Sequence, residues 1–138
     1  MKKLLLLISL LFLTSSFAAA GGYNFISPEN LKQNIEKREN MVIVDIQVKN
    51  EYAQHHLPGV LATHAYPVKS DSDRDKLKSA LALIKTNQLP VVVICPRGGG
   101  GAKRAYDYLA ENGVEVERLK ILEGGQQGWP YPELLAEK

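Results

Sequence analysis

The chain has 138 residues, of which 45% are hydrophobic and 23% charged, and its formal net charge is +2 at pH 7. This length suits one domain with a single core, and the near-neutral charge gives no electrostatic reason to expect nucleic acid or an anionic membrane as a partner. Cys95 is the single cysteine, which excludes an internal disulfide.

The N-terminus has the pattern of a secretory signal peptide. Two lysines precede an apolar run over residues 4–13, and three alanines at 18–20 form a small-residue cleavage site. The run is shorter than the roughly 20 residues that a transmembrane helix needs. We therefore expect residues 1–20 to be removed and residues 21–138 to form one domain. The mature protein would be periplasmic or secreted, without stable membrane association; a retained N-terminal anchor is the alternative.

The first elements of the mature chain alternate between strand and helix. Residues 24–26 suit a short edge strand, and Ser27 is a good helix N-cap because a proline and an acid follow it. Apolar residues 41–44 predict a buried strand that ends at Asp45. The next predicted elements are helical turns over 49–54, a loop over 55–59 and a short strand over 60–64.

The second half continues the alternation. Apolar residues recur at helical spacing and predict an amphipathic helix; they are Leu77, Ala80, Leu81 and Ile84. The β-branched run 91–94 predicts a strand that reaches Cys95, and a helix over 102–111 ends at Asn112-Gly113. Residues 114–119 alternate between apolar and charged, which predicts a half-exposed strand. A loop over 122–125 and short helical segments over 126–129 and 133–136 complete the chain.

This order of elements predicts an α/β fold with a parallel sheet and helices on both faces. Ligands of such folds bind beyond the carboxyl ends of the strands. Asp45 and Cys95 both lie at predicted strand ends, which makes that edge the expected functional site.

Cys95 lies between a strand and a helix, in a loop suited to anion chemistry. The thiolate is the reactive form of cysteine, and a helix N-terminus or nearby cations favour it. Successive glycines let backbone N–H groups turn inward and form an anion-binding nest. We predict that Cys95 is a nucleophile; the predicted substrate-binding residues are Arg97, Gly98, Gly99, Gly100 and Gly101. A buried structural cysteine before a flexible turn is the alternative.

Three separated segments together resemble the rhodanese family of sulfurtransferases. They are Val44-Asp45-Ile46 with Glu51-Tyr52 and His56-Leu57-Pro58-Gly59-Val60, then Val91 to Cys95 with Gly98 and Ala102-Lys103, then Leu122-Glu123-Gly124-Gly125 with Trp129. Order and spacing agree from about Ile26 to Pro132. The resemblance implies a single rhodanese domain with a five-stranded parallel sheet flanked by helices on both faces. Together with the predicted signal peptide, this suggests a single-domain rhodanese of the exported type.

The resemblance also implies a reaction. Cys95 would take the outer sulfur of thiosulfate, polysulfide or a persulfide, and then pass it to cyanide, a thiol or a partner protein. No metal or organic cofactor is implied. Asp45, His56 and Lys103 would have supporting roles, and the three histidines lack the spacing of a metal site.

Two departures from the family pattern concern positive charge. Gly100 and Gln47 stand where family members commonly carry arginine, five residues after the cysteine and two after the strand-end aspartate. We expect Arg97 to supply part of the missing charge. Thiosulfate should then be a poorer donor than polysulfide or a persulfide.

Two other functions fit the loop less well. A cysteine phosphatase or arsenate reductase needs an arginine six residues after the cysteine to clamp a tetrahedral oxyanion, and this chain has Gly101 there. A sulfur-carrier or redox-sensing domain would use Cys95 with little turnover of its own.

Overall fold

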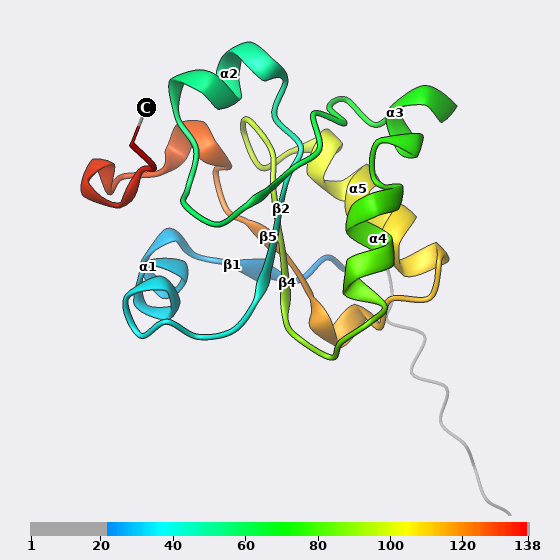
Figure 1. The fold of residues 1–138 in the computed structure, drawn as a ribbon, viewed down its shortest axis with the longest axis horizontal. Coiled ribbons are helices and arrows are strands. Elements are labelled where there is room, and N and C mark those ends of the chain that lie inside the picture. Colours follow the sequence, from blue (N-terminus) through cyan, green and yellow to red (C-terminus); the bar gives the residue numbers. More distant parts are fainter. Residues whose placement is uncertain (1–21, 138) are drawn as a thin grey trace, which may run out of the picture.

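A five-stranded parallel sheet forms the centre of the protein, whose computed structural model describes residues 22–137 (Figure 1). Its strands are β1 (Phe25–Ile26), β2 (Val42–Asp45), β3 (Leu61–Ala62), β4 (Val91–Ile94) and β5 (Leu119–Leu122). Their order in the sheet is β1-β5-β4-β2-β3, and all four pairings are parallel. The predicted fold class is confirmed, with β1 at one edge as expected.

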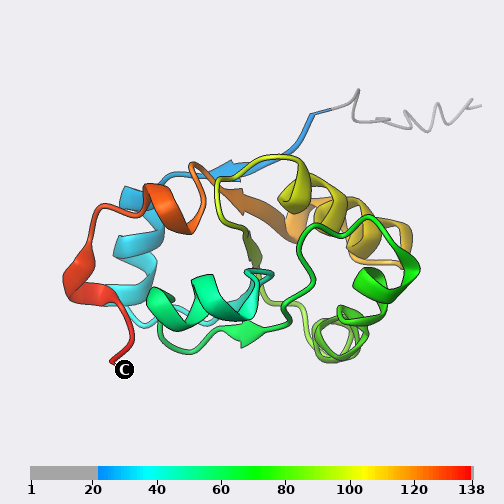
Figure 2. The ribbon, with the colours of Figure 1, turned by 90° about the horizontal axis from the view of Figure 1, so that it is seen from above.

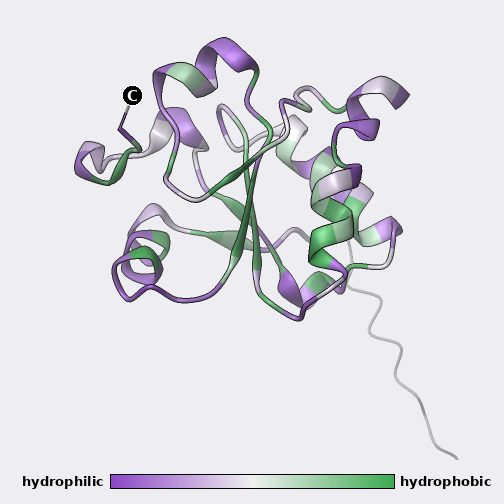
Figure 3. Ribbon diagram, in the orientation of Figure 1, coloured by the Kyte–Doolittle hydropathy of each residue, from purple (hydrophilic) through white to green (hydrophobic). Residues whose placement is uncertain are grey.

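Helices cover both faces of the sheet (Figures 1 and 2). The α-helices are α1 (Pro28–Glu36), α2 (Lys49–Gln54), α3 (Asp71–Asp75), α4 (Lys78–Ile84) and α5 (Gly100–Glu111), and the 3-10 turns are η1 (Val116–Arg118), η2 (Gln126–Gly128) and η3 (Pro132–Leu134). Helices α4 and α5 bury their apolar sides against one face, whereas α1 and Trp129 pack on the other. Figure 3 shows that the central strands of the sheet are mainly apolar.

Local sequence signals account for several helix boundaries. The Ser27 side chain accepts a hydrogen bond of 3.1 Å from the Asn30 N–H group at the start of α1. Ser70 and Asp73 form a capping box that starts α3. The start of α5 differs from the prediction, because the helix begins at Gly100 rather than at Ala102. This earlier start brings the helix N-terminus closer to Cys95.

The predicted half-exposed strand over residues 114–119 is wrong. The strand is β5, and the preceding residues form η1. β5 pairs with β1 along one edge and with β4 along the other, and its apolar side chains join the clusters on both faces of the sheet. Leu119, Ile121 and Leu122 are buried, and Lys120 is exposed. The alternating apolar and charged residues belong instead mainly to the 3-10 turn η1 and its flanks, and the side chain of Arg118 at the end of this turn is largely buried.

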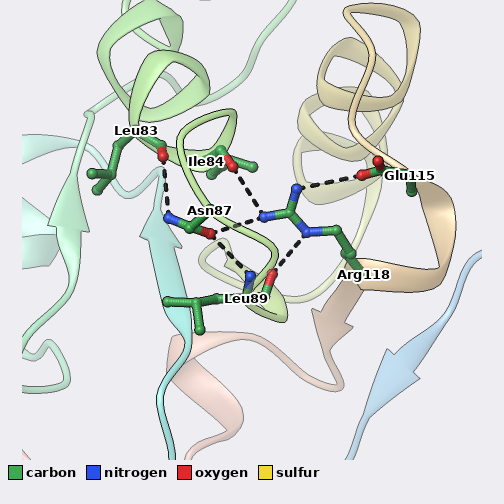
Figure 4. A network of polar contacts seen from close by, with 6 residues as sticks. All are labelled: Leu83, Ile84, Asn87, Leu89, Glu115 and Arg118. Carbon is green, nitrogen blue, oxygen red and sulfur yellow. Dashed lines mark hydrogen bonds and ion pairs between the residues drawn. The ribbon is translucent and has the colours of Figure 1, made fainter.

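Arg118 binds the connections at the amino-terminal edge of the sheet (Figure 4). Its Nε donates to the Leu89 carbonyl at 2.9 Å, and its Nη2 donates to the Ile84 carbonyl and Asn87 Oδ1, both at 3.0 Å. The ion pair with Glu115 is longer, at 3.4 Å. These contacts join the end of α4, the start of β4 and the start of β5, at the edge opposite the strand ends that carry Asp45 and Cys95.

The predicted signal peptide, residues 1–20, lies outside the described part of the chain. Among residues 22–137, no helix combines the length and the apolar character needed to cross a membrane.

Candidate active site

The cysteine loop begins where two strand ends lie side by side. Asp45 and Ile94 are aligned in the pairing of β2 with β4, and the Ile46 N–H group donates to the Ile94 carbonyl at 2.9 Å. Cys95 follows directly and is 2% exposed. The two strand ends that the sequence singled out are therefore neighbours at the carboxyl edge, where α2 also lies (Figure 1).

A backbone N–H group contacts the thiol, and three glycines line the cavity beside it. The Gly98 N–H group donates to Cys95 Sγ at 2.9 Å. Within residues 22–137, the N–H groups of Gly99, Gly100 and Gly101 have no hydrogen-bond acceptor, as is usual at a helix N-terminus. The cavity at the thiol has a volume of about 60 Å³ and is lined by Tyr66, Cys95, Arg97, Gly99, Gly100 and Gly101. This geometry favours negative charge on sulfur or on a small ligand.

The loop after β5 is hydrogen-bonded to the backbone of the cysteine loop. The Gln126 N–H group donates to the Cys95 carbonyl at 2.8 Å, and the Gln127 N–H group donates to the Pro96 carbonyl at 2.9 Å. Gly98 and Gly125 both have positive φ angles, of 74° and 60°. A Cβ atom on Gly125 would lie 2.6 Å from the backbone nitrogen of Arg97. The loop after β5 can therefore approach the cysteine loop this closely only with glycine at residue 125.

Tyr66 is a site residue that the sequence did not assign. Its hydroxyl oxygen accepts a hydrogen bond of 3.1 Å from Arg97 Nη2, and its ring lines the thiol cavity. The ring also packs on Gly101, where a Cβ atom would lie 2.7 Å from Cδ2 of the tyrosine. Tyr66 therefore both positions Arg97 and explains the glycine at residue 101.

Asp45 supports the site from within the core. Its carboxylate accepts hydrogen bonds from the Gln47 N–H group at 2.9 Å and from Gln47 Nε2 at 3.0 Å. Burial raises the pKa of the Asp45 carboxyl above its ordinary value, whereas the hydrogen bonds from Gln47 act in the opposite direction. Gln47 Nε2 also donates to the His55 carbonyl at 3.0 Å. Through Gln47, the strand-end carboxylate fixes the chain that follows α2.

The other predicted supporting residues do not line the thiol cavity. His56 Nδ1 donates to the Tyr52 carbonyl at 2.8 Å, and its ring stacks on that of Tyr52 with centroids 3.9 Å apart. The Lys103 ammonium group lies 5.5 Å from the centre of the Tyr23 ring. In the part of the chain that the structure describes, no group of three or more His, Cys, Asp or Glu side chains could hold a metal ion.

A larger cavity, of about 300 Å³, lies beside the site and does not include Cys95. It is lined by His55, Gln126, Gln127, Trp129, Pro130, Pro132 and Leu135. The Gln126 side chain is 5% exposed, and neither of its amide atoms has a hydrogen-bond partner among the described residues. Gln126 thus contributes to the thiol site through its backbone and not through its side chain.

Comparison with known proteins agrees with this geometry. The family model of the rhodanese-like domain matches residues 27–130. No curated protein matches the chain.

Solved structures share the fold at low sequence identity. A rhodanese-like domain protein from Staphylococcus aureus is 24% identical over 83% of this chain and 98% of its own, with a TM-score of 0.61. Ygr203w from Saccharomyces cerevisiae is 19% identical over 82% of this chain and 86% of its own, with a TM-score of 0.66. That yeast protein is described as a homolog of single-domain rhodanese and the Cdc25 phosphatase catalytic domain, and also as a protein tyrosine phosphatase of the rhodanese family.

Proposed function

The chain belongs to the rhodanese-like domain family, and we propose that it is a sulfurtransferase that carries the transferred sulfur on Cys95. The observation that carries this proposal is the 2.9 Å hydrogen bond from the Gly98 N–H group to Cys95 Sγ. The next three glycines line the same cavity as Cys95, and their N–H groups have no acceptor among the described residues. A loop of N–H donors stabilises negative charge on a thiolate and on the outer sulfur of a persulfide.

The first half-reaction loads the cysteine. The Cys95 thiolate attacks the sulfane sulfur of the donor and forms a new S–S bond. The S–S or S–SO₃ bond of the donor breaks, and its electron pair leaves with a thiolate, a shorter polysulfide or sulfite. The small cavity, of about 60 Å³, has room for the added sulfur, since one water occupies about 30 Å³ of liquid.

The second half-reaction unloads it. A thiolate or cyanide attacks the outer sulfur of the persulfide, and the S–S bond breaks with its electron pair returning to Cys95. The acceptor leaves as a persulfide or thiocyanate. The two displacements balance without an external oxidant or reductant, and the covalent intermediate divides one transfer into two steps.

A phosphatase is the second candidate, because the structurally similar yeast protein is described as one. The loop in this chain does not suit that reaction. Gly101 occupies the position of the clamping arginine, and the Tyr66 ring fills the space beside it. The two functions predict different products from the same cysteine.

Intact-mass measurement tests the proposal. The mature protein is incubated with polysulfide, with an organic persulfide and with thiosulfate, and Cys95→Ser serves as the control. We expect a gain of one sulfur atom that is absent in the variant and is removed by cyanide or a thiol. No adduct from any sulfane donor would overturn the proposal. An adduct without turnover favours a carrier, and hydrolysis of an aryl phosphate favours a phosphatase.

We also propose that the protein is exported, on the strength of the lysines, the apolar run and the alanines of residues 1–20. The N-terminal residue of the protein recovered from a periplasmic fraction tests this. We expect it to be Gly21. Recovery of the intact chain from the cytoplasm would contradict export.

A further inference from the structure

We propose that Arg104 binds the anionic part of the sulfur donor beside Cys95, and that it thereby sets a preference for anionic donors over neutral ones. The inference rests on the proposed sulfurtransferase function and names the substrate class for that site. Arg104 lies nine positions after Cys95, in the first turns of α5. From the sequence alone it would be assigned to the solvent-exposed side of this helix. Only the folded chain shows where its guanidinium group lies.

The guanidinium group of Arg104 occupies the space that a side chain at residue 100 would fill. A Cβ atom on Gly100 would lie 2.8 Å from Arg104 Nη1 and 3.5 Å from both Cζ and Nη2. Residues 100 and 104 are one turn apart on the same face of α5, so this approach follows from helix geometry. Gly100 lines the thiol cavity, and Arg104, which lines the adjoining cavity, brings its guanidinium group against Gly100.

A second contact fixes the direction of the side chain. Arg104 Nε donates to the Pro67 carbonyl at 2.9 Å, and the side chain is partly buried. The other N–H groups of the guanidinium have no acceptor within residues 22–137. Asp107 and Glu111 line an adjoining cavity of about 160 Å³ together with Arg104, yet no described carboxylate pairs with it within 4.0 Å. Arg104 thus keeps both its charge and its terminal donors available.

Two guanidinium groups lie at or next to the thiol cavity. Arg97 lines it directly and is held by the Tyr66 hydroxyl, whereas Arg104 lies over Gly100. Guanidinium N–H groups form strong hydrogen bonds with anionic oxygens and sulfurs. The donors that fit are those with negative charge next to the sulfane sulfur, namely thiosulfate, polysulfide and organic persulfide anions.

Alkylation of the single cysteine reports this charge without requiring sulfur transfer. Iodoacetate and iodoacetamide react with the same thiolate, but only iodoacetate is an anion. The ratio of their second-order rate constants therefore cancels the thiolate fraction and reports the local attraction of anions. In Arg104→Gln we expect this ratio to fall about tenfold, the factor that corresponds to about 1.4 kcal/mol.

Two further variants separate a local effect from a general loss of charge. Arg74→Gln removes a guanidinium from the adjoining cavity, where it pairs with Asp71 at 3.2 Å, and we expect its ratio to stay within twofold of wild type. Gly100→Ala displaces the Arg104 side chain while keeping the charge, and we expect a fall in the same direction. In the double variant with Arg104→Gln, Gly100→Ala should add nothing further.

Loading of Cys95 with sulfur completes the test. We expect Arg104→Gln to lower the rate of persulfide formation from thiosulfate about tenfold relative to its rate of alkylation by the neutral reagent iodoacetamide. An unchanged alkylation ratio and an unchanged rate of loading by thiosulfate in a folded Arg104→Gln protein overturn the role of Arg104 alone. A wild-type protein that takes sulfur from no donor overturns the proposed function, and with it the assignment of a sulfur donor to Arg104.

Discussion

The carbonyl oxygen of Cys95 accepts a hydrogen bond of 2.8 Å from the N–H group of Gln126. This bond joins the ends of β4 and β5, which are neighbours in the sheet. It leaves the thiol free on the other side of the loop, where Gly98 donates to Sγ. The position of the nucleophile therefore depends on a segment about thirty residues later in the chain, and on the glycines that let it approach.

Gly125→Ala should disrupt this docking. Its φ of 60° is unfavourable for alanine, and the added methyl group would overlap the backbone of residues 95–98. We expect the free energy of unfolding to fall by about 3 kcal/mol, and the rate of Cys95 alkylation by iodoacetamide to change as the loop moves. Gly128→Ala is the matched control, because a Cβ atom there meets nothing within 4 Å. Equal stability of the two variants in urea unfolding would contradict the docking role.

Tyr66→Phe should release Arg97. The variant keeps the ring that packs on Gly101 and removes the hydroxyl that accepts from Arg97 at 3.1 Å. Stability should change by less than about 0.5 kcal/mol because Arg97 is exposed. We expect kcat/KM for an anionic donor to fall a few fold, mainly through KM. A fall in stability without a change in KM would show that the tyrosine only packs.

Asp45→Asn should remove a pH dependence of stability. Burial raises the pKa of Asp45 above its ordinary value of 3.8, so the folded state holds this proton more tightly than the unfolded state does. Its contribution to stability is then fully present below the ordinary value and is lost as the pH rises through the raised folded value.

We therefore expect the free energy of unfolding of the wild type to decrease as the pH rises from the ordinary pKa of Asp45 through its raised folded pKa, and that of Asp45→Asn to lack this component. Urea unfolding at a series of pH values measures it, with Asp71→Asn as a control whose side chain is exposed. The same pH profile in wild type and Asp45→Asn would exclude Asp45 as its source.

Arg118→Ala should lower stability and leave the chemistry of Cys95 unchanged. Its side chain is 11% exposed and donates to the carbonyl groups of Leu89 and Ile84 (Figure 4). Removal of the guanidinium group leaves these two carbonyl groups without their hydrogen-bond donor. We expect this loss to reduce the free energy of unfolding by about 2–3 kcal/mol. Glu115→Gln, which removes only the 3.4 Å ion pair, should change stability much less.

The thiol should react with iodoacetamide at the same rate in both folded variants, because Arg118 lies at the opposite edge of the sheet. A large change in that rate would show coupling between the two edges.

The sequence by itself determined the fold class and the position of the nucleophile. Buried strands, helix caps and the run from Cys95 to Gly101 are local patterns, and a parallel α/β sheet collects strand ends at one edge. Asp45 and Cys95 could be placed there because β2 ends at Asp45 and Cys95 directly follows the end of β4 at Ile94. The last strand was misplaced, because the alternation of 114–119 does not reveal that residues 116–118 form a 3-10 turn and that the strand begins at Leu119.

Only the tertiary structure decided which side chains surround the thiol. Tyr66 reaches Arg97 across 31 positions of the chain, and Pro67 fixes Arg104 across 37. No local pattern predicts such contacts, since the segment before α3 has neither a helix nor a strand to define its direction. The charge that the sequence shows missing at Gly100 is supplied one turn later by Arg104, because glycine at residue 100 leaves the space for its guanidinium group.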